Sequence, residues 1–128
     1  MAAFLLDTHT LIWMAKNDPA LTKNALTILD SDHTLYLSIA SVWEMSIKIK
    51  NEKLKLDYQL EKFIEIAIQK HSLNLLNISL SHIYHLQQLP LHHRDPFDRL
   101  LIAQSIVDNL PIISAETAFD DYQIKRVW

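Results

Sequence analysis

Short apolar runs alternate along the chain with longer stretches in which apolar residues recur at helical spacing. Runs of three or four residues are too short to form helices, and largely apolar strands are typical of a parallel sheet covered on both faces. Such runs lie at 3–6, 35–37, 75–78 and 111–113, and 124–128 is a candidate edge strand. The alternation predicts an α/β fold.

The clearest helical pattern lies in the middle of the chain, where apolar residues stand at i, i+3, i+4, i+7 and i+8. These residues are Leu60, Phe63, Ile64, Ala67 and Ile68. A second helix is predicted over 21–29, with Asp18 and Pro19 as its cap and first turn. Further helices are predicted over 39–50, 79–88 and 96–109.

Length and charge set limits on the fold and the partners. We expect one domain over residues 1–128, because a chain of 128 residues is long enough for a single hydrophobic core. The formal net charge is -3, so the protein lacks the overall basic field of many nucleic-acid binders. Residues 1–6 carry no basic segment and only a short apolar run, so neither a signal peptide nor contact with a membrane is expected.

Two residue types are missing from the sequence. Without cysteine, disulfides, thiolate nucleophiles and zinc–thiolate sites are excluded, and a cytoplasmic location is expected. Without glycine, the glycine-rich loops that bind phosphate in nucleotide-binding proteins are excluded as well. Any phosphate chemistry must therefore depend on other groups.

Four acidic residues occupy equivalent places in the predicted topology. Asp7 directly follows the first apolar run, Glu44 lies in the helix after the second run, Asp98 lies in the first turn of the helix at 96–109, and Glu116 follows the run at 111–113. Functional groups in a parallel sheet gather beyond the carboxyl ends of the strands. We therefore expect these acids to meet at one edge of the sheet.

Helix capping is an alternative role for each acid by itself. Ser41 and Glu44 have the spacing of a capping box. Asp95 has the position of an N-cap, and Asp98, three residues later, would complement the helix dipole. Likewise, the first of the four acids could cap the helix that follows it, and the last could be a solvated charge at a helix start.

Capping does not explain why four acids should lie at the same edge. Two carboxylates about 5 Å apart, at an effective dielectric constant of about 20, repel each other by about 3 kcal/mol. Such a cluster needs protons or a cation, and oxygen ligands favour Mg²⁺ or Mn²⁺. A metal and carboxylates together predict hydrolysis of a phosphodiester by a metal-bound water.

Three segments resemble the PIN-domain nucleases and, within them, the VapC-type toxins. They are 5–9 (LLDTH), 41–48 (SVWEMSIK) and 93–104 (HRDPFDRLLIAQ). The resemblance implies a three-layer α/β/α fold with a central parallel sheet of about five strands. It also implies magnesium-dependent cleavage of RNA, homodimers, and hetero-oligomers with a small antitoxin protein whose segment covers the active site.

The same resemblance assigns roles to the acids. It makes Asp7, Glu44 and Asp98 catalytic acids that bind the metal. Asp95 is the competing choice to Asp98, but Asp98 has the better register with the apolar run at 100–103, so Asp95 is assigned to helix capping. Glu116 stands where such proteins usually have aspartate, so it is a fourth metal-binding candidate.

Neighbouring polar residues are candidates for supporting roles. Thr8 and Ser114 are predicted either to hydrogen-bond the carboxylates or to cap helices. Arg94, Arg99 and Lys48 are predicted to contact RNA phosphates or to pair with the nearby acids.

Histidines offer little support for a zinc site. His82 and His85 stand at i and i+3 on a predicted helix, but zinc needs three or four convergent ligands. His92 and His93 are expected in a loop, more often without a role than near the substrate.

Two other α/β enzyme classes fit the sequence less well. Haloacid-dehalogenase-like phosphatases need a second aspartate where this chain has His9, and receiver domains need an acceptor aspartate after a middle strand, where this chain has Asn77. A catalytically silent PIN-like module that binds an antitoxin or RNA is the non-enzymatic alternative. The presence of Asp7, Glu44 and Asp98 argues against it.

Overall fold

The computed structural model describes residues 2–128, which build a five-stranded sheet in the order β3-β2-β1-β4-β5 with every neighbouring pair parallel. The strands are β1 (Ala3–Leu6), β2 (Thr34–Ser38), β3 (Asn74–Leu76), β4 (Ile112–Ile113) and β5 (Arg126–Val127). The predicted α/β fold, with its parallel sheet of about five strands, is confirmed.

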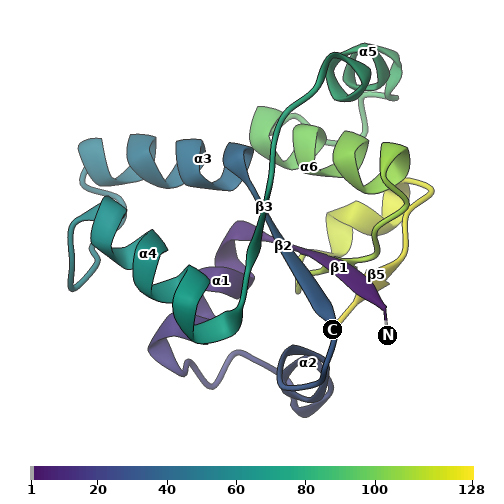
Figure 1. Cartoon of the computed structure of the whole chain (residues 1–128). Helices are drawn as coiled ribbons and strands as arrows, with labels where there is room; N and C mark the ends of the chain where they lie inside the picture. Colours follow the sequence, from purple (N-terminus) through teal and green to yellow (C-terminus); the bar gives the residue numbers. More distant parts are fainter. Residues whose placement is uncertain (1) are drawn as a thin grey trace.

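Helices connect the strands and cover both faces of the sheet (Figure 1). They are α1 (Thr8–Lys16), α2 (Lys23–Leu29), α3 (Ile39–Lys50), α4 (Leu60–His71), α5 (Leu80–Gln88), α6 (Pro96–Val107) and the 3₁₀ helix η1 (Thr117–Asp121). Within residues 2–128, none of them has the length and apolar content needed to cross a bilayer.

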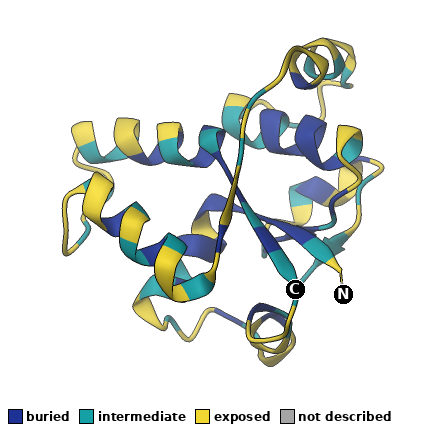
Figure 2. Ribbon diagram, viewed as in Figure 1, coloured by how far each residue is buried: buried dark blue, intermediate teal, exposed yellow. Residues whose placement is uncertain are grey.

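Alternating side chains of the central strands pack into two separate hydrophobic cores. Phe4 and Leu6 of β1 pack into a core with α1, α2, α3 and α4, whereas Leu5 points to the other face and packs with α6 and η1. Leu5 and Leu6 are fully buried, and Figure 2 shows the dark blue central strands between helices that are exposed on their outer sides. This is the three-layer arrangement that the resemblance implied.

Two predicted helix boundaries differ from the structure by two residues. Helix α2 begins at Lys23 and not at 21, because the Thr22 side chain accepts a hydrogen bond from the Ala25 amide at 3.0 Å. Asp18 instead accepts from the Ala20 amide in the preceding turn. Helix α6 ends at Val107, because the chain turns away at Asn109, which has a left-handed φ of 53°.

Candidate active site

The candidate site lies at the carboxyl end of β1, the central strand. From β1 the sheet extends through β2 to β3 on one side and through β4 to β5 on the other, so this end is the point at which the strand order reverses. Asp7 follows β1 and Ser114 follows β4. A shallow depression of about 250 Å³ lies beside Asp7 and is lined by Asp7, His9, Trp13, Ala115, Glu116 and Thr117.

Asp7 is almost completely buried and is held by Ser114. The Ser114 hydroxyl donates to Asp7 Oδ2 at 2.7 Å and accepts from the Glu116 amide at 2.9 Å. Although Asp7 occupies the N-cap position of α1, its side chain makes no cap hydrogen bond. The capping alternative therefore does not account for the Asp7 carboxylate.

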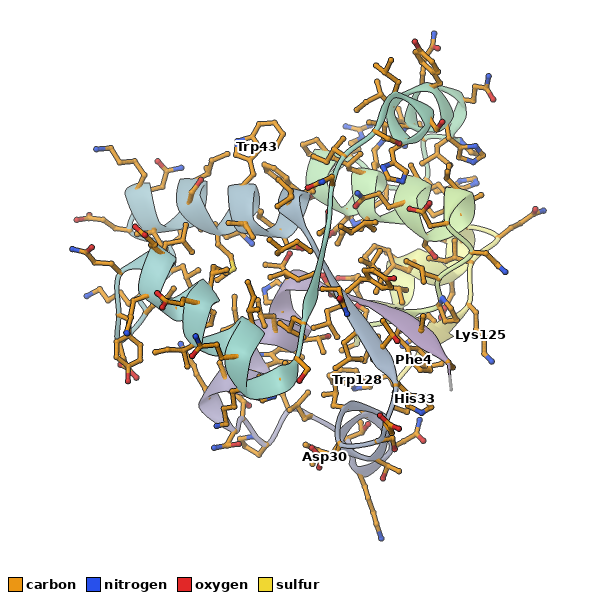
Figure 3. All side chains as sticks on the ribbon, in the orientation of Figure 1. Phe4, Asp30, His33, Trp43, Lys125 and Trp128 are labelled. Atoms are coloured by element: carbon orange, nitrogen blue, oxygen red, sulfur yellow. The ribbon has the colours of Figure 1, made fainter. Side chains whose placement is uncertain are left out.

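Glu44 lies on the buried side of α3, where both carboxylate oxygens have partners. Thr8 Oγ1 donates to Glu44 Oε1 at 2.7 Å, and Lys48 Nζ lies 2.9 Å from Oε2. The neighbouring Trp43 points outward from α3 (Figure 3) and is 54% exposed. The predicted capping box of Ser41 and Glu44 is wrong, because α3 begins at Ile39 and both residues lie inside it.

Asp98 lies in the first turn of α6, with its carboxylate free of any capping role. Asp95 is the N-cap and accepts from the amides of Phe97 and Asp98 at 2.9 and 3.0 Å, which confirms the capping prediction for Asp95. Asp98 Oδ2 instead lies 2.8 Å from His93 Nε2. The structure therefore separates the capping acid from the acid that is available for chemistry.

Burial and mutual repulsion make Asp98 a weak acid. Burial raises its pKa to about 7, and the charges of Asp7, Asp95 and Glu44 act in the same direction. The hydrogen bond from His93 opposes the shift without cancelling it. The negative charges at this edge of the sheet are therefore close enough to repel one another.

The pKa values of Asp7 and Lys48 are also shifted by burial and by the nearby negative charges. Burial raises the pKa of Asp7, with a further contribution from Glu44, against the stabilising hydrogen bond of Ser114. Burial of Lys48 disfavours its charge, but the hydrogen bond and charge of Glu44 outweigh it and raise the pKa of Lys48. Lys48 thus offsets part of the negative charge, while Asp7 and Asp98 remain destabilised as anions.

The acids share one edge of the sheet but do not form a ready-made metal site. In the described residues, no three side chains of the Asp, Glu, His and Cys types are arranged to hold an ion. Each acid is engaged with a protein donor, and throughout residues 2–128 every buried side-chain nitrogen or oxygen has a hydrogen-bond partner. The charges of these acids interact, and their convergence on one metal ion stays a prediction.

Glu116 is the acid that differs most from expectation. It is exposed, and its Oε1 accepts from the Ala118 amide at 3.1 Å as the N-cap of η1. These contacts agree with the alternative role of Glu116 as a charge at the start of a helix. Metal binding by Glu116 stays a prediction.

The sequence matches the family model of the PIN domain over residues 4–125. The chain belongs to the PIN-domain family. The resemblance drawn from the three sequence segments is confirmed, and the phosphatase and receiver alternatives fall away. Because PIN domains are generally nucleases, membership supports a hydrolase that acts on nucleic acids.

Solved structures of the same fold extend over nearly the whole PIN domain. VapBC2 from Rickettsia felis, bound to a DNA fragment from its promoter, has a TM-score of 0.73 at 16% identity, with 99% of this chain and 98% of that chain covered. DNA-bound VapBC from Salmonella typhimurium has a TM-score of 0.69 at 18% identity, covering 99% and 98%. FitAcB from Neisseria gonorrhoeae has a TM-score of 0.67 at 16% identity, covering 100% and 97%. Comparison with curated protein sequences gives no match.

The three basic candidates of the PIN domain have different surroundings. Lys48 pairs with Glu44, as the pairing alternative predicted, and its side chain is 33% exposed. Arg94 is exposed. The Arg99 guanidinium makes no ion pair with the predicted acids and instead donates to backbone carbonyl groups, the shortest contact being 2.9 Å to Pro90. Phosphate binding by Arg94, Arg99 and Lys48 stays a prediction, and the contacts of Arg99 show that it also holds the loop before α6.

Two histidines have defined roles in the PIN domain. His82 is buried in a capping box with Ser79, and its Nε2 lies 2.7 Å from Asp108 Oδ2, so it ties α5 to the end of α6. His93 contacts Asp98 directly, although the sequence favoured a loop position without a role. Spacing gives no signal for this contact, because it depends on the conformation of the loop before α6.

The raised pKa of Asp98 leads to a prediction about stability in the absence of metal. The folded state holds a proton on Asp98 up to about pH 7, whereas the unfolded chain loses it near 3.8, so this group lowers stability as pH rises between these values. We expect Asp98→Asn to stabilise the protein at pH 8 by about 1–2 kcal/mol, less than the full shift because the site is partly solvated, and to have little effect near pH 4. Urea unfolding in EDTA across this range measures the difference. An equal stability difference at every pH would contradict the prediction.

Proposed function

We propose that this PIN domain, spanning residues 1–128, is a metal-dependent endoribonuclease that acts as the toxin of a toxin–antitoxin pair. The observation that carries the proposal is that Asp7, which is buried, and Asp98, which is half-buried, come from opposite ends of the sequence and repel each other at one edge of the sheet. Each charge raises the free energy of the other. A protein gains nothing in stability from such a pair, which is typical of a functional site.

The chemistry of these side chains suits a hard divalent cation. Carboxylate oxygens are the ligands that Mg²⁺ and Mn²⁺ prefer, and the pKa values of Asp7 and Asp98 are raised in the absence of an ion. Asp7 and Asp98 would hold the ion. Glu44 has both oxygens engaged by Thr8 and Lys48, so it would contribute its charge or a water-mediated contact. When bound, the metal would polarise the phosphate of the substrate and lower the pKa of a bound water.

Other residues of the chain would prepare the site. Ser114 fixes Asp7, and Thr8 fixes Glu44 through hydrogen bonds of 2.7 Å, so neither carboxylate is free to rotate. Lys48 stands at the partly exposed side of the acidic cluster, where it can approach a phosphate of the substrate. Fixed ligands and a placed cation reduce the reorganisation that the reaction requires.

RNA as the substrate and an antitoxin as the partner rest on the family. The segments that resemble VapC-type toxins support RNA cleavage. A solved neighbour, VapBC-5 from Mycobacterium tuberculosis, is a member of a family of toxin–antitoxin systems. We extend this assembly to the present chain, together with a homodimer within the toxin–antitoxin complex and a cytoplasmic location.

The proposal is tested by expression and by cleavage assays. Induction of the wild-type chain alone in a bacterial host should arrest growth, and induction of Asp7→Asn should not. The purified wild type should cleave at least one of a panel of transfer, ribosomal and messenger RNAs in Mg²⁺ or Mn²⁺. Binding of RNA or of an antitoxin without any cleavage would instead establish the catalytically silent module.

A further inference from the structure

The loop before α6 delivers one histidine to the carboxylate of Asp98. His93 Nε2 lies 2.8 Å from Asp98 Oδ2, and both side chains are shielded, with 22% and 18% of their surfaces exposed. Among the described residues, His93 is the side chain that hydrogen-bonds this carboxylate. The His93 ring also lies near the buried Phe119, with ring centroids 6.4 Å apart.

Both backbone groups of His93 are held by side chains from elsewhere in the fold. The amide of His93 donates to the Tyr122 hydroxyl at 2.9 Å, and the carbonyl of His93 accepts from Arg99 Nη1 at 3.3 Å. The Tyr122 hydroxyl in turn donates to the Pro90 carbonyl at 2.9 Å, which also accepts from Arg99. Two side chains therefore fix the main chain on both sides of the imidazole.

Arg99, one of the two side chains that hold the main chain of His93, lies in the same helical turn as Asp98. Arg99 follows Asp98 directly, and its second nitrogen, Nη2, donates to the carbonyls of Leu86 and Leu89 at 3.4 Å. The first turn of α6 therefore carries both the Asp98 carboxylate and one of the two side chains that hold the main chain of His93.

We propose that His93 is a positioning residue of the nuclease site, which selects the rotamer of Asp98 that holds the metal. This inference rests on the proposed function. It requires only a hydrogen on Nε2, which both the neutral Nε2–H tautomer and the imidazolium provide, so it does not depend on the protonation state. Donors that orient metal-binding carboxylates typically change metal affinity by about 10- to 100-fold.

The test compares three substitutions of His93 with one neighbouring control in the full chain. His93→Leu removes the donor, His93→Asn shortens its reach, and His93→Gln keeps an N–H donor at a similar distance. His92→Leu is the matched control, since His92 is exposed and packs edge-on against Tyr122 without contacting an acid. Binding of Mn²⁺ is measured by electron paramagnetic resonance, with RNA cleavage against metal concentration and melting temperature in EDTA as further readouts.

We expect His93→Leu and His93→Asn to weaken Mn²⁺ binding by about 10- to 100-fold, with His93→Gln and His92→Leu within a few fold of wild type. Saturating metal should restore most of kcat in the weakened variants, and melting temperatures in EDTA should stay close to that of wild type. Since the asparagine variant keeps a polar side chain, it decides the outcome if the leucine variant fails to fold.

Two results would overturn the inference. If Mn²⁺ binds His93→Leu or the folded His93→Asn as tightly as it binds wild type, His93 does not position the Asp98 carboxylate. That result would leave the proposed nuclease activity unaffected. If His93→Gln loses as much affinity as His93→Asn, the effect does not come from the donor. A wild-type chain that neither binds Mn²⁺ nor cleaves RNA would instead overturn the proposed function together with the role of His93.

Discussion

Replacing Asp98 with asparagine is expected to lower the rate of RNA cleavage by about 10³-fold, corresponding to a loss of about 4 kcal/mol of transition-state stabilisation. The variant keeps the shape of the side chain and removes the charge that a cation requires. Asp7→Asn should have an effect of the same size. Initial rates on a labelled RNA in saturating Mg²⁺ measure both.

Asp95→Asn is the matched control for this substitution. Asp95 lies three residues before Asp98 and caps the same helix through the amides of Phe97 and Asp98. Asparagine caps helices about as well as aspartate, so this variant should cleave within a few fold of wild type. If both variants lose activity equally, or neither does, the assignment of Asp98 to the chemistry is wrong.

Divalent metal is expected to stabilise the folded protein strongly. An ion at about 100 times its Kd adds about 2.7 kcal/mol to the free energy of unfolding, which for a domain of this size raises the melting temperature by roughly 10 °C. The gain arises because the ion compensates the repulsion between Asp7 and Asp98 in the native state. Thermal unfolding in MnCl₂ and in EDTA measures it.

The double variant Asp7→Asn/Asp98→Asn separates this site from weak surface binding. It should melt at the same temperature with and without Mn²⁺, and Asp95→Asn should respond like the wild type. A shift in the double variant as large as in the wild type would place the bound metal elsewhere.

The fold was predictable because its strands and helices have recognisable local patterns of apolar residues. Strands buried on both faces must be apolar, which made β1 and β2 visible as short runs, and the repeat at Leu60, Phe63 and Ala67 marked the inner face of α4. Helix ends were less predictable. Thr22 and Asp18 are both good capping residues, but in the structure Thr22 caps α2, whereas Asp18 accepts from the Ala20 amide in the preceding turn.

Part of the candidate site could be predicted for a related reason. Parallel strands place their carboxyl ends at one edge, so the position of Asp7 after β1 and of Ser114 after β4 follows from topology. The assignment of capping to Asp95 and of the chemistry to Asp98 also followed from the sequence, because Asp95 directly precedes Pro96, a residue typical of the first helical position.

Hydrogen bonds from Thr8 and Ser114 to the carboxylates were one of two predicted roles and are present, but which carboxylate each residue meets could not be predicted. The spacing of Ser41 and Glu44 satisfied the capping-box rule, but Ser38 starts the helix earlier, and Glu44 meets Thr8 across 36 positions of sequence. The pairing of His93 with Asp98 depends on a loop held by groups on other elements. Sequence spacing contains no information about such long-range hydrogen bonds.

The central claim is that Asp7 and Asp98 bind one metal ion together. Anomalous diffraction from crystals of the wild-type protein soaked in MnCl₂ tests it most directly. We predict one manganese peak with carboxylate oxygens of both Asp7 and Asp98 in its coordination shell. A peak bound to only one of these residues, a peak elsewhere on the protein, or no peak at saturating manganese would contradict the claim.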